Sequence, residues 1–142
     1  MIPLSKDKSK MDRRLFGTSL GEKGWYRVVD FANESFGSAI IGVDTEYWYD
    51  NNSSFWFSVN TTYQNGKITE LSRLENVADI ITGARITRDA TTQDRYFEIY
   101  YNSVQNNYVY ISILSSLGLS SVKPINFEIS PSDAVVLNNL SL

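Results

Sequence analysis

Residues 54–74 read SFWFSVNTTYQNGKITELSRL, and this stretch decides the fold. Its apolar residues recur at every second position, which is the period of a half-buried β-strand. The Asn65-Gly66 pair in its middle is typical of a two-residue turn, and such a turn pairs Phe57 with Leu74. The stretch therefore predicts an antiparallel hairpin with one apolar face. The residues expected on that core face are Phe55, Phe57, Val59, Tyr63, Ile68 and Leu74.

Short segments with the same alternation occur on both sides of this hairpin. The expected strands cover residues 25–31, 38–49, 54–63, 67–74, 80–88, 95–102, 108–114 and 122–130, with a last short strand or extended tail at 134–140. Nothing between them is long and periodic enough for a crossover helix. Short strands joined by Asn, Ser, Gly and Asp indicate an all-β sandwich or barrel.

The side-chain pattern of these strands predicts which residues face the core. Residues 95–114 are expected to form a second hairpin with a loop at 103–107, which sets Tyr100 opposite Tyr110. Pro124 has no amide hydrogen to donate, so it suits an edge position or a strand start. The inward residues expected outside the first hairpin are Ala39, Ile41, Val43, Thr45, Phe97, Ile99, Tyr101, Val109, Ile111, Ile113, Ile125, Phe127 and Ile129.

The N-terminal residues differ from the rest in charge. Residues 1–27 hold seven basic against three acidic side chains, whereas the rest of the chain holds six basic and thirteen acidic ones. Glycines, the last of them Gly24, interrupt this region. We therefore expect a basic arm or linker at 1–24 and a β domain at 25–142. A basic arm on an acidic domain can bind nucleic acid or dock on an acidic partner, or it can be a solvated tail. Its attachment residues are expected to be Lys6, Lys8, Lys10, Arg13 and Arg14.

Composition narrows the classes of function. The 142 residues include no His and no Cys, which excludes a Ser-His-Asp triad, a Cys nucleophile, disulfides and any metal site built on His or Cys. This favours a protein that is not an enzyme and holds no cofactor or metal. The chain also lacks an apolar run of the ~20 residues that a membrane span needs, an apolar signal segment and a basic patch in the β domain. We therefore expect a protein that folds in the cytoplasm where it is made, without membrane or nucleic-acid partners.

Three acids, Asp44, Glu46 and Asp50, lie close together in the sequence. Two carboxylates about 5–10 Å apart across a cleft could hydrolyse a glycoside. Oxygen ligands from this group, or from the loop between Asp89 and Asp94, could bind calcium, although neither stretch has the spacing of a dedicated calcium loop. A solvated strand edge and ordinary turn chemistry are the simpler interpretations.

The aromatic residues, 13% of the chain, are the most informative for function. Several of them fall on the polar side of their strands. Outward rings can be the buried centre of a subunit interface, platforms on which a sugar ring stacks, or cross-strand pairs that stabilise the sheet. The candidate contact residues are Trp48, Trp56, Tyr96, Tyr100, Tyr108 and Tyr110, with Asp44, Glu46 and Asp50 as their polar partners.

Several short motifs resemble a module of bacteriophage fibre and receptor-binding proteins. They begin with Gly24-Trp25-Tyr26-Arg27-Val28 and Ser38-Ala39-Ile40-Ile41-Gly42-Val43, and continue with Phe57-Ser58-Val59, Asn65-Gly66-Lys67-Ile68, Ala84-Arg85-Ile86 and Tyr96-Phe97-Glu98-Ile99-Tyr100-Tyr101-Asn102. The resemblance covers roughly residues 20–137, nearly the whole β domain.

This resemblance implies a jelly-roll-like antiparallel β-sandwich of about eight strands that is not an enzyme. It implies a virion structural protein, in a tail or head fibre or on the particle surface, that forms a homotrimer and meets the host, where a cell-surface glycan is a candidate partner. The basic arm would attach the domain to other virion proteins. No binding residue is transferred from the family, because the matched motifs are sheet framework. The alternative is a monomeric carbohydrate-binding module that uses the outward aromatic residues.

Overall fold

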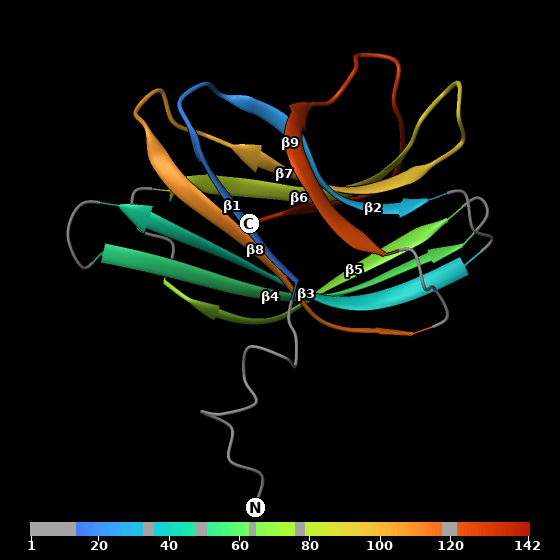
Figure 1. Ribbon diagram of the computed structural model, residues 1–142, viewed down its shortest axis with the longest axis horizontal. Helices are drawn as coiled ribbons and strands as arrows, with labels where there is room; N and C mark the ends of the chain where they lie inside the picture. Colours follow the sequence, from blue (N-terminus) through green and yellow to red (C-terminus); the bar gives the residue numbers. More distant parts are fainter. Residues whose placement is uncertain (1–13, 33–35, 48–50, 63–64, 76–78, 118–121) are drawn as a thin grey trace, which may run out of the picture.

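The computed structural model describes residues 14–32, 36–47, 51–62, 65–75, 79–117 and 122–142. These residues form ten β-strands in two antiparallel five-stranded sheets (Figure 1). The strands are β1 (Arg14–Leu20), β2 (Gly24–Ala32), β3 (Phe36–Tyr47), β4 (Asn51–Thr62), β5 (Gly66–Leu74), β6 (Ile81–Arg88), β7 (Arg95–Tyr101), β8 (Asn107–Leu117), β9 (Lys123–Ile129) and β10 (Val135–Ser141). The prediction of an all-β sandwich is confirmed, with ten strands rather than about eight.

The strand orders define two sheets. Sheet A follows the order β1-β8-β3-β4-β5, and sheet B follows β10-β6-β7-β2-β9. Strands far apart in the sequence, such as β1 and β8 or β2 and β7, are neighbours within a sheet, which is typical of jelly rolls. In the described part of the chain, no helix is long and apolar enough to cross a membrane.

The core lies between the two sheets. Phe57 of sheet A packs against Phe97 of sheet B, with ring centroids 5.6 Å apart. Most of the predicted inward residues are buried, because the two-residue period of each strand holds along its length. The buried ones are Ala39, Ile41, Val43, Thr45, Phe55, Phe57, Val59, Ile68, Phe97, Ile99, Tyr101, Val109, Ile111 and Ile113. Tyr63, also predicted to face the core, lies outside the described residues.

The first strand lies inside the region that the charge pattern assigned to an arm. β1 pairs with β8 along its whole length. Leu20 is buried, and its carbonyl accepts a hydrogen bond from the Tyr101 hydroxyl at 2.8 Å. The predicted arm is therefore wrong for residues 14–24, because Gly17 is a strand residue here and does not break the chain. The rest of that arm, residues 1–13, lies outside the described residues.

β7 and β8 are consecutive in the sequence but lie in opposite sheets. The predicted hairpin over 95–114 is therefore wrong, since β7 pairs with β6 and β2 whereas β8 pairs with β1 and β3. Tyr100 and Tyr110 do not face each other and lie on different sheets. The alternation predicted which face each residue takes, but it does not specify the partner strand.

The first hairpin is present with a different register. Phe57 pairs with Glu70 rather than with Leu74, because the strands end at residue 62 and resume at residue 66. The register differs from the predicted one by an even number of residues, so the side chains of β4 still point to the predicted sides of the sheet. A β-bulge at Leu71 then reverses the faces of the last residues of β5, and Leu74 is 65% exposed instead of buried.

The two sheets approach each other along both margins. β1 lies against β9, where the rings of Phe16 and Phe127 are 5.7 Å apart. β5 lies against β10, where the Ile68 amide donates a hydrogen bond to the Asn138 side chain at 3.3 Å. β9 is an edge strand, as expected for Pro124. Of its predicted inward residues, Ile125 and Phe127 are partly buried but Ile129 is exposed, because an edge strand has a neighbour on one side only.

Candidate functional site

The outer face of sheet A brings five of the predicted site residues together. They come from three adjacent strands: Asp44 and Glu46 from β3, Trp56 from β4, and Tyr108 and Tyr110 from β8. In the sheet register Asp44 is directly opposite Tyr110, and Glu46 is opposite Tyr108. We call this surface the contact face. Its central residues are Gly42, Asp44, Glu46, Ser54, Trp56, Tyr108, Tyr110 and Ser112.

The other predicted site residues lie elsewhere. Tyr96 and Tyr100 belong to β7 and point outward from sheet B. Arg14 begins β1, so one member of the predicted attachment group is part of the sandwich. The remaining ones lie outside the described residues, and they are Trp48, Asp50, Lys6, Lys8, Lys10 and Arg13.

The indole of Trp56 lies against the backbone of the neighbouring strand. Gly42 is its cross-strand partner, and a Cβ at Gly42 would lie 2.7 Å from Cη2 of the indole. Glycine is needed here because no side chain fits beneath the ring. The ring is thus held against the sheet, and Trp56 remains partly exposed.

Tyr110 is held in the same way on the other side of β3. Its ring lies over Gly17 of β1, where a Cβ would come within 2.7 Å of Cε1. The ring of Tyr108 stacks beside it, with centroids 5.9 Å apart and planes 13° from parallel. The contact face therefore carries flat aromatic surfaces on both sides of β3.

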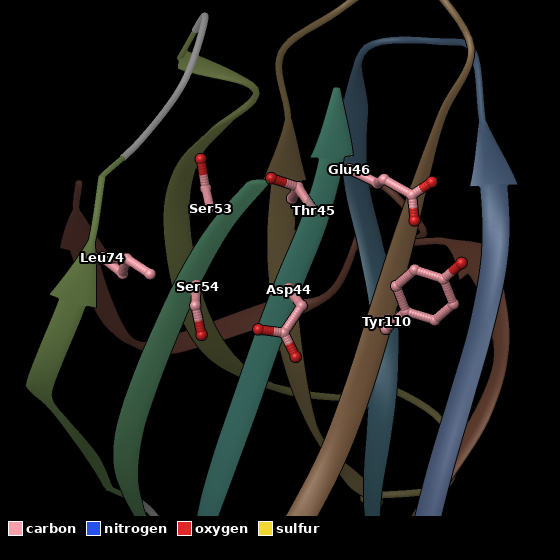
Figure 2. A pocket seen from close by; sticks show the side chains of 7 residues that line it. All are labelled: Asp44, Thr45, Glu46, Ser53, Ser54, Leu74 and Tyr110. Atoms are coloured by element: carbon pink, nitrogen blue, oxygen red, sulfur yellow. The ribbon is translucent and has the colours of Figure 1, made fainter. Parts of the chain in front are cut away.

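Glu46 is coupled to Tyr110. Burial and the negative charge of Glu46 raise the pKa of Tyr110. Figure 2 shows the Glu46 side chain reaching over β8 toward that hydroxyl. Asp44, in contrast, makes no hydrogen bond or ion pair with any other described residue.

A pocket of about 320 Å³ lies at this end of the contact face (Figure 2). Leu74 of β5 lies at one side of it and Tyr110 of β8 at the other, with Asp44 and Ser54 between them. The lining residues are Asp44, Thr45, Glu46, Ser53, Ser54, Leu74 and Tyr110. The pocket thus combines an aromatic ring and an aliphatic side chain with closely spaced oxygen atoms, and none of its lining residues is basic.

Two β-bulges add leucines to the margins of the contact face. Leu71 is the extra residue where the β4–β5 register shifts, and Leu114 is the extra residue where the β3–β8 register shifts. Both side chains are more than half exposed. A bulge changes the direction of a side chain, so these leucines extend the apolar surface outward from the polar centre.

The outer face of sheet B is built from a row of alternating charges. Glu128 of β9, Arg27 of β2, Glu98 of β7 and Arg85 of β6 follow one another across the strands. Glu98 is fully buried and accepts a hydrogen bond from the Arg85 guanidinium at 2.8 Å and from two hydroxyl groups at 2.7 Å. Sequence reasoning missed this row, because the four residues become neighbours only through the strand pairing.

Aromatic rings cover this charge row. The Arg27 guanidinium lies 4.1 Å from the centroid of the Tyr96 ring, and the Arg85 guanidinium lies 4.1 Å from that of Trp25. Trp25 in turn contacts Tyr100 edge to face, with centroids 5.3 Å apart. Burial raises the pKa of Tyr96 to about 12. Tyr96 and Tyr100 therefore have partners within their own sheet, as expected for cross-strand aromatic pairs.

The carboxylates of the contact face are not arranged like a glycosidase pair. Asp44 and Glu46 are two residues apart on one strand, so they project side by side rather than facing each other across a bond. Among the described residues no group of three or more His, Cys, Asp or Glu could hold a metal ion. Asp89 accepts hydrogen bonds from the amides of Thr91 and Thr92 at 2.9 Å, which is turn chemistry.

Comparison with known proteins does not identify a family for this chain. No family model matches the chain, and no curated protein matches it. The chain is similar to the crystal structure of the Acinetobacter phage vB_ApiP_P1 tailspike protein, with a TM-score of 0.41 and 9% sequence identity. The similarity covers 80% of this chain and 22% of the tailspike chain, so the matched part is less than a quarter of the tailspike's length.

Proposed function

We propose that this chain is a non-enzymatic contact domain of a bacteriophage virion, either a trimeric fibre or adhesion domain or one that decorates the particle. The observation that carries the proposal is the contact face. The rings of Trp56 and Tyr110 lie against the backbones of Gly42 and Gly17, with Asp44 on the strand between them, and both residues remain partly exposed. Rings fixed in this way form a binding surface that loses little conformational entropy when a partner binds.

The assignment to a phage rests on the sequence resemblance. Its motifs at residues 24–28, 38–43 and 96–102 fall largely on β2, β3 and β7, which are inner strands of the two sheets. The fold that the resemblance implied, an antiparallel sandwich, is the fold found. In this proposal the protein is made in the host cytoplasm and assembled into the virion. Its basic N-terminal residues, Lys6, Lys8, Lys10 and Arg13, attach it to other virion proteins.

Self-association into a trimer is supported by exposed aliphatic side chains on the two opposite edges of sheet B. Ile129 is exposed on edge strand β9, and Val135 and Val136 are exposed on edge strand β10. A cyclic trimer needs a head-to-tail contact between two different patches of each chain. Edge strands covered in this way are also protected from uncontrolled pairing. The contact face of sheet A then stays open for a partner.

The test is the mass of the full chain in solution by light scattering. A trimer gives three times 16.1 kDa at micromolar concentration. Ile129→Glu and Val136→Glu should each lower the mass to that of one chain, because a head-to-tail contact uses both patches. Leu71→Glu on sheet A is the matched control and should leave the trimer intact. A mass of 16.1 kDa for the unaltered chain rejects the trimer.

A monomeric carbohydrate-binding module is the second candidate. The flat rings of the contact face favour it, since a sugar ring stacks its C–H face on an aromatic face while nearby oxygen atoms bind its hydroxyls. It predicts a mass of 16.1 kDa together with glycan binding that Trp56→Ala weakens without loss of folding. Glycan binding by a trimer would instead combine the two candidates in one adhesion protein.

A further inference from the structure

We infer that the pocket between Tyr110 and Leu74 binds an amine-bearing pyranose, that is, an amino sugar with a free ammonium group. The inference rests on the contact role proposed above, because it names the class of ligand for the same face. Three properties of the pocket carry it: its aromatic side, its unpaired carboxylate and its oxygen-rich lining.

The aromatic side is suited to a sugar ring. The ring of Tyr110 lies against Gly17, and the Glu46 side chain reaches toward its hydroxyl, so the ring has few other orientations before a ligand binds. Leu74, 65% exposed, lies three strands away on β5 and supplies an aliphatic surface at the far end of the pocket. The volume of about 320 Å³ is near the lower end of the ~300–1,000 Å³ typical of ligand pockets, which suits a small ligand.

The charged residues that line the pocket favour a ligand of positive charge. Asp44 and Glu46 are both negative, and no basic side chain lines the pocket. Asp44 has no hydrogen-bonding or ionic partner among the described residues. Two carboxylates on one strand, about 7 Å apart by strand geometry, favour a cation and disfavour an anion. Ser54 beside Asp44 adds a hydroxyl that can bind a sugar hydroxyl.

Several carboxylates of this fold are paired with arginine side chains. Glu98 is paired with Arg85 at 2.8 Å, and Glu70 with Arg73 at 2.6 Å. These pairs satisfy carboxylates both in the buried row of sheet B and on the exposed strand β5. Asp44 stands beside an aromatic ring without such a partner, so an external ammonium group would be its natural counterion.

The experiment titrates the full chain with three sugars that share one ring and differ in charge. Glucosamine is cationic, glucose is neutral and glucuronate is anionic, and binding is followed by chemical-shift changes in NMR spectra. We expect glucosamine to bind roughly fivefold more tightly than glucose, the effect of a solvent-exposed ion pair, and glucuronate to bind more weakly than glucose. Equal affinities for glucosamine and glucuronate, or no binding of any of the three, overturn the inference.

Three variants locate the binding. Asp44→Asn keeps the shape of the side chain and should abolish the preference for glucosamine over glucose. Tyr110→Ala should weaken binding of both sugars, whereas Tyr100→Ala removes an outward tyrosine of sheet B and should weaken neither. Thermal unfolding of each variant checks that it is folded. An unchanged preference in Asp44→Asn contradicts the role assigned to this carboxylate.

The outcomes also separate this inference from the proposed function. If the chain is a trimer and binds none of the sugars, the proposed contact domain is supported and the amino-sugar site is refuted. If the chain is a monomer and prefers glucosamine, the proposed trimer is refuted and the amino-sugar site is supported.

Discussion

Glycines and aromatic rings form matched pairs on both outer faces of the sandwich. The pairs are Trp56 on Gly42, Tyr110 on Gly17 and Trp25 on Gly83. A glycine inside a strand weakens the strand, because it has high conformational freedom when unfolded and no side chain to pack. A ring lying across it restores packed area and shields the backbone from water. Each glycine therefore depends on the ring of its neighbour.

Gly42→Ala should lower the free energy of unfolding by about 1–3 kcal/mol, the usual cost of overpacking. The added methyl group would lie 2.7 Å from Cη2 of Trp56, so the indole has to lift from the sheet. Urea unfolding measures the change. In a Trp56→Ala background the same substitution should cost clearly less, as a double-mutant cycle would show. An equal cost in both backgrounds would assign the clash to Ser112, whose Oγ would be 2.8 Å away.

Glu98→Gln should lower the free energy of unfolding by about 3–5 kcal/mol, because it leaves the buried guanidinium of Arg27 and its neighbour Arg85 without their shared negative partner. Glu70→Gln is the matched control. It breaks an Arg–Glu pair of similar length on the exposed strand β5, where the expected loss is below about 1 kcal/mol. A similar decrease in unfolding free energy in both variants would show that burial does not make the Glu98 interactions more stabilising than an exposed pair.

Single residues of the site were predictable only in part. The alternation predicts that Trp56, Tyr108 and Tyr110 point outward, and they do. It does not predict that they share one face with Asp44, because that depends on β8 pairing with β3. It also places Glu98 on the outer side without predicting its burial, which comes from neighbouring rings and guanidinium groups that converge on it only in the folded sheet.

At the scale of elements, β1 closes the margin of sheet A beyond β8. A chain that begins at residue 14 should retain the unfolding free energy of the full chain to within about 1 kcal/mol, because it keeps all ten described strands. A chain that begins at residue 25 should unfold more easily and aggregate, because it loses β1 with buried Leu20 and exposes the edge of β8. Urea unfolding and light scattering measure both effects. Equal stability of the two shortened chains would show that β1 is dispensable.

The turn between β6 and β7 should make stability depend on pH below 4. Hydrogen bonds from the amides of Thr92 and Thr91, together with Arg27, lower the pKa of Asp89 from 3.8 to about 2. A carboxyl whose pKa is lowered by folding stabilises the fold above its unfolded pKa. That contribution is therefore present above about pH 4 and is lost as the pH falls toward 2.

Comparison of the unaltered chain with Asp89→Asn isolates this contribution. The difference in unfolding free energy between the two should be larger at pH 5 than at pH 2, as measured by urea unfolding at each pH. Other carboxylates titrate equally in both proteins and cancel in the comparison. A difference that does not change with pH would mean that the turn does not depend on the Asp89 charge.

The strands themselves were more predictable than their partners. Nine of the ten follow from the alternation of apolar and polar residues, with ends displaced by a few residues. β1 was missed because Gly17 and the basic residues around it resemble a linker. The prediction of a β7–β8 hairpin was wrong. Strands that are consecutive in the sequence often form hairpins, but in this fold the connection from β7 to β8 crosses from sheet B to sheet A.

At the scale of the whole molecule, most pairing joins distant parts of the chain. β1 pairs with β8, and β6 pairs with β10, although the strands of each pair are far apart in the sequence. Such non-local contacts slow folding, because long loops lose entropy before any contact forms. We expect refolding from urea on a time scale of about milliseconds to seconds, followed by tryptophan fluorescence in a stopped-flow instrument. Complete refolding within microseconds would contradict this expectation.

The different construction of the two outer faces has a consequence for adaptation. Sheet B is tied together by interdependent charges and rings, so a change at one of its outward positions disturbs several others. The contact face has small polar residues around its rings, at Ser58, Asn60, Thr69 and Ser72, which are half-exposed or exposed. Mutations at these positions can alter what the face recognises while the framework stays unchanged. A lineage could diversify its specificity on this surface, and the same positions are a natural choice for a combinatorial library.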